Sequence, residues 1–335
     1  MNHTRRGLLL LAGLLCAIPS ALAQVKIEKR DFAGWPNSYW VGNGRLELVV
    51  TSDVGPRIIS LRLGEGPNLF SVREDFAGKT GGEEWRNYGG HRLWHAPEEK
   101  ARTYQPDNAP VQVETLADGL RLTAAVETKT GIRKSIEIKL DPTQPRVTVL
   151  HRLTNAGLWP VRLAPWAISV MAPGGFGISP LPTRFHPDRL LPNRTLVLWP
   201  YTDLRDDRYY LGTDLVMLRH RAGIDPARER AKIGVANDEG WCAYAREGYL
   251  FLKRFTFAEG AAYPDLGASV ELFTNNRMLE VETLGPFVDL APGATVTHQE
   301  EWEVWDGIPL PFGDEAAIRA RLLPLVERGR ARGNR

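Results

Sequence analysis

Apolar and polar residues alternate along much of this chain, in short runs that end near glycine, proline or asparagine. A period of two places the apolar side chains of a β-strand on one face. Many short strands at close spacing predict a large antiparallel sandwich or barrel. Clear runs of this kind are 45–51, 57–63, 111–116, 120–127, 132–140, 147–154, 161–171, 249–257, 269–274 and 295–304. We therefore expect an all-β fold in a single domain over residues 24–329.

The C-terminal stretch has the periodicity of a helix, which we expect over residues 314–328. Asp314 can cap its first turn, and arginines gather at its end. Pro324 lies inside this stretch and is expected to kink or shorten the helix. The apolar stripe that predicts packing on the sandwich consists of Ile318, Leu322, Leu325 and Val326.

Two glutamates lie in a strand-like run at 278–284. Glu280 and Glu282 are two residues apart, so they share one face, roughly 6.5 to 7 Å apart along the strand. The opposite face carries Leu279, Val281 and Thr283. Carboxylates in a cleft accept hydrogen bonds from hydroxyls and can transfer protons, which points to a polyhydroxylated ligand. The alternative is an ordinary solvated sheet face.

Two long segments, 71–107 and 173–208, do not have the pattern of strands. Both are rich in aromatic, histidine, arginine and acidic residues. Long ordered loops tend to carry function, so we expect these segments to form the walls of a cleft.

The N-terminus has the features of a cleavable signal peptide over residues 1–23. Arg5 and Arg6 precede an apolar run, and small residues allow cleavage after Ala23. The apolar run is too short for a membrane anchor. These features predict a periplasmic or secreted protein.

Charge and cysteine content narrow the function classes. Removing residues 1–23 takes away two arginines and no acids, so 42 basic and 40 acidic residues become 40 of each. Such a balance argues against a nucleic-acid or membrane-surface role, which needs a concentrated basic field. Cys242 is then the single remaining thiol, so no intramolecular disulfide is expected.

Four groups of short motifs resemble the galactose mutarotase-like (aldose 1-epimerase) superfamily, and within it a bacterial branch whose function is not established. They are GGHRLW at 89–94, LTN…PW at 153–166, PNR…LWPYT at 192–202 and YPD…FTN…LEVETLGP…PG at 263–293. The resemblance spans most of the mature chain and implies a β-supersandwich. It also implies a carbohydrate ligand and no cofactor.

In that superfamily a glutamate in a short L-E-T segment is the general base, and the resemblance carries this role onto Glu282. The general acid is a histidine soon after a T-N segment. Here Trp166 stands where that histidine would be, and an indole N–H does not titrate at neutral pH. His91 is therefore our candidate acid, with His95 as the alternative, because imidazole titrates near neutral pH.

Several further residues are candidates for holding a sugar. Each also has a structural explanation, as an ordinary ion pair, a core aromatic or a turn residue. The expected substrate-binding residues are Arg92, Trp94, His95, Trp166, Asp265, Asn275 and Glu280. The spacing of His91 and His95 could suggest zinc, but no HExxH pattern or third ligand is evident, so we expect no metal.

These observations predict an exported carbohydrate-binding protein, with sugar epimerase or mutarotase activity by Glu/His proton transfer. One alternative is a sugar-recognition protein without turnover, which Trp166 favours. Another is a lyase or hydrolase acting on an acidic polysaccharide. No obligate protein partner, nucleic acid or membrane association is expected.

Overall fold

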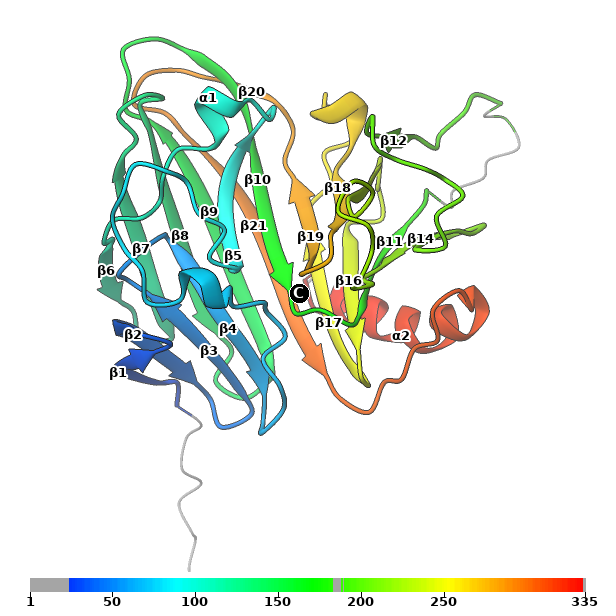
Figure 1. Ribbon diagram of the computed structural model, residues 1–335, viewed down its shortest axis with the longest axis horizontal. Helices are drawn as coiled ribbons and strands as arrows, with labels where there is room; N and C mark the ends of the chain where they lie inside the picture. Colours follow the sequence, from blue (N-terminus) through cyan, green and yellow to red (C-terminus); the bar gives the residue numbers. More distant parts are fainter. Residues whose placement is uncertain (1–23, 183–187, 189, 334–335) are drawn as a thin grey trace, which may run out of the picture.

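Two large antiparallel sheets pack face to face in this computed structural model (Figure 1). The structure describes residues 24–182, 188 and 190–333, so the expected signal peptide lies outside the described residues. The strand pairings are antiparallel throughout the described residues. The predicted all-β supersandwich is confirmed.

The first sheet has eleven strands within the described residues. In spatial order they are β1 (Lys26–Phe32), β2 (Trp35–Gly42), β3 (Leu46–Thr51), β4 (Arg57–Leu63), β5 (Gly90–Ala96), β10 (Val161–Met171), β19 (Leu279–Leu284), β18 (Val270–Thr274), β15 (Ala231–Val235) and β12 (Leu196–Leu198), with β20 (Val288–Leu290) paired to β10. Short helical turns at its margins are η1 (Glu74–Phe76), α1 (Lys100–Thr103) and η2 (Asp265–Gly267).

The second sheet has ten strands in the part of the chain that the structure describes. In spatial order they are β13 (Tyr209–Leu211), β14 (Leu215–Arg219), β11 (Phe176–Pro180), β16 (Trp241–Arg246), β17 (Tyr249–Phe255), β21 (Thr295–Trp305), β9 (Arg146–Asn155), β8 (Ile132–Leu140), β7 (Gly119–Val126) and β6 (Gln112–Thr115).

The main hydrophobic core lies between the two sheets. Alternation along the strands sends Leu93 and Val281 of the first sheet into it, opposite Val149 and Trp302 of the second. Burying one side chain of this size contributes about 1.5–3 kcal/mol. This core therefore fixes which side chains of β5, β10 and β19 must point the other way, to the outer face of the first sheet.

The C-terminal helix α2 (Glu315–Gly333) packs on the outer face of the second sheet (Figure 1). Its predicted stripe, including Ile318 and Leu322, contacts a second cluster with Ile178 and Met217. The predicted cap is confirmed, because Asp314 Oδ1 accepts a hydrogen bond from the Ala317 amide at 3.0 Å. The helix continues past Pro324, beyond the predicted end. No described helix is long and apolar enough to cross a membrane.

The expectation that 71–107 and 173–208 lack strands was wrong. The first segment contains β5, and the second contains β11 and β12. All seven residues of β5 are buried, polar ones included, so the strand shows no alternation between apolar and polar positions. Gly90 begins it with φ +69°, and a Cβ there would lie 2.3 Å from the Ile58 carbonyl oxygen of β4. Glycine is therefore required for this close approach.

Candidate functional site

The register of five adjacent strands gathers charged and aromatic side chains on the outer face of the first sheet. Arg92 of β5 pairs with Ile168 of β10, which pairs with Glu282 of β19, which pairs with Glu271 of β18. Residues paired in this way point to the same face. The outer-face cluster, as we name it, consists of Arg92, Trp94, Trp166, Lys232, Glu271, Glu280 and Glu282, all buried.

Glu282 lies at the centre of this cluster. Its Oε2 accepts a hydrogen bond from the Trp166 indole Nε1 at 2.7 Å, and the Lys232 ammonium lies 3.5 Å away. Its Oε1 is buried with no hydrogen-bond partner among the described residues. Burial raises the pKa of Glu282, Lys232 opposes that rise, and the charge of Glu280 adds to it. The predicted sharing of one face by Glu280 and Glu282 is confirmed, although that face is buried.

Lys232 of β15 connects two carboxyl groups. Its Nζ lies 2.6 Å from Glu271 Oε2 as well as 3.5 Å from Glu282 Oε2. It also lies 5.0 Å from the ring centroid of Trp166 and 4.5 Å from that of Trp199, within cation–π range. Burial lowers the pKa of Lys232, but the two carboxylates outweigh burial and hold that pKa well above its usual range. Lys232 is therefore a fixed ammonium ion.

Arg92 forms the other side of the cluster. Its Nη2 donates to Glu280 Oε1 at 3.1 Å, and its guanidinium carbon lies 4.5 Å from the Trp94 ring centroid and 5.5 Å from that of Trp85. The remaining nitrogens, Nε and Nη1, are buried without a hydrogen-bond partner among the described residues. The Trp94 and Trp166 rings meet edge to face at 5.4 Å.

Two tyrosines from the long segments lie around this cluster. Tyr104 donates to Glu98 Oε1 at 2.5 Å, and its ring centroid lies 4.9 Å from that of Trp94. Burial raises the pKa of Tyr201; Lys232 opposes the rise, and the charges of Glu282 and Glu98 add to it. Both hydroxyl groups are therefore electrostatically coupled to the outer-face cluster. Both long segments thus contribute side chains to its surroundings, and their role as walls of a cleft stays a prediction.

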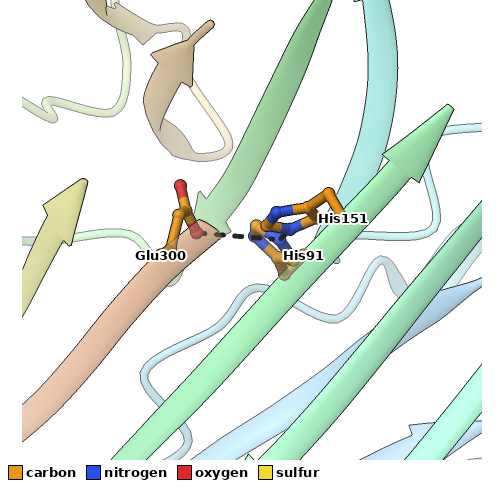
Figure 2. A group of neighbouring side chains, drawn as sticks. All are labelled: His91, His151 and Glu300. Carbon is orange, nitrogen blue, oxygen red and sulfur yellow. Dashed lines mark hydrogen bonds and ion pairs between the residues drawn. The ribbon is translucent and has the colours of Figure 1, made fainter. Parts of the chain in front are cut away.

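The structure places His91 on the other side of the sheet from Glu282. It follows the alternation of β5 into the space between the sheets, where it is fully buried. Its Nε2 lies 2.7 Å from Nε2 of His151 and 3.9 Å from Glu300 Oε2 (Figure 2). Its Nδ1 lies 2.8 Å from Ser169 Oγ. The expected pairing of His91 with Glu282 across a sugar was therefore wrong, because the sheet itself separates the two side chains.

His91 belongs to a buried core network of Ser169, His91, His151, His298, Thr283, Glu300 and Lys253. Glu300 Oε1 lies 2.8 Å from the Lys253 ammonium and accepts a hydrogen bond from Thr283 Oγ1 at 2.5 Å. Glu300 Oε2 accepts a hydrogen bond from Trp302 Nε1 at 2.7 Å. Burial would raise the pKa of Glu300, but Lys253 and the three histidines outweigh it and lower that pKa. The network is thus internally paired, unlike the outer-face cluster.

Among the described residues, this network includes a set of side chains that could hold a metal ion. The ligand atoms of His91, His151 and Glu300 lie within 4.8 Å of one another. The His151 Nδ1 donates to the His298 carbonyl at 2.8 Å, so its neutral ring offers Nε2 as the acceptor that His91 already uses. The nearby Lys253 ammonium neutralises Glu300. The hydrogen bonds of these groups are therefore complete within the protein.

Three other predicted binding residues lie outside the outer-face cluster. His95 faces inward, with Nε2 3.8 Å from Glu127 Oε2. Asn275 occupies the β18–β19 turn and accepts a hydrogen bond from the Arg277 amide. Asp265 begins η2 with φ 48° and is close enough to raise the pKa of Glu271. The structure therefore brings together Glu282, Glu280, Arg92, Trp94 and Trp166 of the predicted set.

Two charged members of the cluster, Glu271 and Lys232, were missed from sequence. Glu271 lies in the predicted strand 269–274, where alternation places it on one face with Phe273. Lys232 is the charged residue of an otherwise apolar run at 231–235. A charge inside a buried strand is the signal that could have found each of them.

No family model and no curated protein sequence matches the chain. Solved structures share its architecture. A galactose mutarotase related enzyme from Lactobacillus acidophilus has a TM-score of 0.51 at 8% identity, over 81% of this chain and 98% of that one. A galactose mutarotase-like protein from Lactobacillus casei has a TM-score of 0.50 at 10% identity, over 80% and 100%. The fold is that of the galactose mutarotase-like proteins.

The mutarotase-like fold also occurs within a longer protein. A TPR-domain containing protein from Parabacteroides distasonis has a TM-score of 0.54 at 16% identity, and the match covers 83% of this chain but 48% of that one. Identities this low establish the fold alone. Membership of a particular bacterial branch stays a prediction, and the roles of individual residues rest on the geometry of this chain.

Proposed function

We propose that the outer-face cluster binds a carbohydrate. The fold is shared with mutarotase-like proteins, and the cluster combines hydrogen-bonding groups with indole rings on one sheet face. Trp94 and Trp166 supply two nearly buried indole rings beside the charged groups, and indole rings are the apolar partners that C–H groups of sugars prefer. The hydroxyl groups of Tyr104 and Tyr201 add further polar contacts beside them.

The observation that carries this proposal is the set of unpaired buried atoms. Glu282 Oε1 has no donor other than a proton on the facing Glu271, and Arg92 Nε and Nη1 have no acceptor among the described residues. A buried polar group without a partner costs about 1–3 kcal/mol. A hydroxyl both donates and accepts, so one polyol can satisfy the carboxylate and the guanidinium together. A simple anion or cation could satisfy just one of them.

A second candidate function is the interconversion of sugar anomers, with Glu282 as the base. It is favoured by the raised pKa of this carboxyl, which brings it closer to that of a working general base. His91 lies on the opposite face of the sheet from Glu282, so it cannot act as the acid. Trp166 donates a hydrogen bond to Glu282 through an N–H that does not titrate.

Titration calorimetry with a panel of neutral and acidic monosaccharides and short oligosaccharides tests binding. At least one sugar should bind, and Glu282→Gln should weaken its affinity at least about tenfold, the loss of one charged hydrogen bond. Glu259→Gln, at an exposed position, is the matched control and should bind normally. A folded protein that binds no sugar in the panel would contradict the proposal.

We also propose export, as residues 1–23 indicate. Expression of the full chain in a Gram-negative host, followed by mass measurement of the periplasmic fraction, should give a protein that begins at Gln24. A cytoplasmic protein that retains residues 1–23 would contradict export.

A further inference from the structure

We propose that Glu271 and Glu282 form a proton-sharing carboxyl pair that performs acid–base chemistry on the bound sugar, with Glu271 as the acid. This inference rests on the proposed carbohydrate site. It supplies the acid that a tryptophan at position 166 cannot supply.

The pair is built by the sheet. Glu271 and Glu282 are directly paired residues of β18 and β19, and they point to the same face. Directly opposite residues have Cβ atoms about 4.5–5.5 Å apart. Both side chains are fully buried, and one Lys232 ammonium contacts both carboxyls. The two carboxyls are therefore close enough to influence each other's ionisation.

The balance of surrounding charges favours one proton on the pair of carboxyl groups. Arg92 balances Glu280, and Lys232 can balance one of the two remaining carboxylates. A second buried negative charge would lack a counterion, so protonation is the less costly state. The titratable or charged groups that face the pair are Lys232 from β15, Glu280 from β19, Arg92 from β5, Asp265 from η2 and Tyr201 from the segment after β12.

The proton belongs on Glu271. Glu282 receives the Trp166 N–H, a donor that favours its ionised form. Burial raises the pKa of Glu271 well above its usual range, and Glu282 and Asp265 add to the rise, while Lys232 opposes it. The pair therefore offers a carboxylic acid and a carboxylate side by side, which is the arrangement that acid–base catalysis needs.

The reaction needs no other reagent. Glu282 removes the proton of the anomeric hydroxyl, a C1=O bond forms, and the bond from C1 to the ring oxygen breaks as Glu271 gives that oxygen its proton. The open aldehyde rotates about C1–C2. On reclosure, Glu271 takes back the proton of the C5 hydroxyl as its oxygen attacks C1, and Glu282 returns its proton to the former carbonyl oxygen. Both carboxyls regain their starting states.

The test follows anomer exchange by NMR for the sugar that binds best, across pH 5–9, with the uncatalysed rate subtracted. Wild type should accelerate exchange, with a rate that falls in base as Glu271 loses its proton. Glu271→Gln should lower the rate at least about 100-fold and remove the basic fall, with an affinity within about threefold of wild type. Glu271→Asp should recover part of the rate, and Glu259→Gln should match wild type.

Three results would overturn the inference. They are sugar binding without faster exchange in wild type, a Glu271→Gln rate within about threefold of wild type, and a wild-type rate that does not fall in base. The last needs no variant, so it decides the matter even if Glu271→Gln fails to fold. Absence of sugar binding is a different failure, because it removes the proposed function first.

Discussion

Two polar clusters lie on opposite faces of the same three strands. On the inner face of β5, β10 and β19, His91, Ser169 and Thr283 join the core network, whose hydrogen-bonding groups pair with one another. On the outer face, Arg92 and Glu282 keep buried atoms without a partner among the described residues. His91 and Arg92 are neighbours in β5, yet both ring nitrogens of His91 have a hydrogen-bond partner and two nitrogens of Arg92 have none in the described part of the chain.

The two clusters also differ in how they hold charge. Lys253 and the histidines of the core network outweigh burial and lower the pKa of Glu300, whereas burial outweighs Lys232 in the outer-face cluster and raises the pKa of Glu271 and Glu282. Complete pairing stabilises one conformation, and incomplete pairing leaves groups for a ligand. The contrast teaches that burial and charge alone do not mark a site, because the core network is buried and charged and yet its groups are paired with one another.

The largest expected effect is on the core network. Lys253→Met leaves Glu300 buried without its counterion, which should lower the free energy of unfolding by about 3–5 kcal/mol. Urea denaturation measures this. Lys129→Met, at an exposed position, should change stability by less than about 0.5 kcal/mol. A loss below about 1 kcal/mol for Lys253→Met would show that the network is not a major source of stability.

Acid should act on the two clusters with opposite signs. The pKa of each core histidine is lowered, that of His298 to about 3, so the unfolded chain binds more protons below about pH 6.5 and stability falls as pH drops. The raised pKa of Glu271 means that the folded state binds more protons above pH 4.5, so this group adds stability as pH drops. The two contributions partly cancel in wild type.

The Glu271→Gln variant separates the contribution of the histidines to the pH dependence of stability from that of Glu271. Without this compensating group, the stability of the variant should fall more steeply with acid than that of wild type, by about 1.4 kcal/mol per pH unit between pH 4.5 and the raised pKa of Glu271. Denaturation curves at several pH values measure both slopes. Parallel slopes would mean that Glu271 is ionised in the folded protein.

A smaller effect is expected at Arg92. Arg92→Lys keeps the charge beside Glu280 but removes the planar donors that lie over Trp94. Sugar affinity should fall about tenfold, by calorimetry, and stability should change by less than about 1 kcal/mol. Arg277→Lys, in an exposed pair with Asp75, should leave affinity unchanged. Equal affinities for Arg92→Lys and wild type would remove Arg92 from the site.

The smallest effect is expected for the stability of Glu282→Gln. Burial disfavours the charge of Glu282, and a neutral amide of the same shape avoids that cost. Stability should stay within about 0.5 kcal/mol of wild type or rise, while Glu300→Gln, on the other face, should be clearly destabilised. Equal losses of stability in Glu282→Gln and Glu300→Gln would show that the two clusters do not differ in how they hold charge.

Sequence reasoning reached the fold and one strand of the site. Alternation in 278–284 correctly assigned Glu280 and Glu282 to one face, because β19 is an uninterrupted strand. It failed at β5, where polar residues lie on both buried faces and hide the strand. Had 90–96 been recognised as a strand, the same alternation would have placed His91 and His95 away from Arg92 and Trp94.

The remainder of the site depends on which strands are neighbours. Glu271 and Lys232 join Glu282 because β18 lies between β15 and β19, although Lys232 is fifty residues from Glu282 in sequence. A period of two describes each strand alone and contains no information on such pairings. The Lys232 contacts to two carboxylates and two indoles therefore appear in the folded chain and not in any local pattern.

The hydrogen bond between Trp166 and Glu282 has a spectroscopic consequence. The indole N–H points at a carboxylate whose ionisation changes its electrostatic surroundings, so the emission of Trp166 should follow the charge of that group. Subtracting the spectrum of a Trp166→Phe variant isolates this signal from the other nine tryptophans. The Trp166 indole can thus serve as an optical reporter of the charge on Glu282.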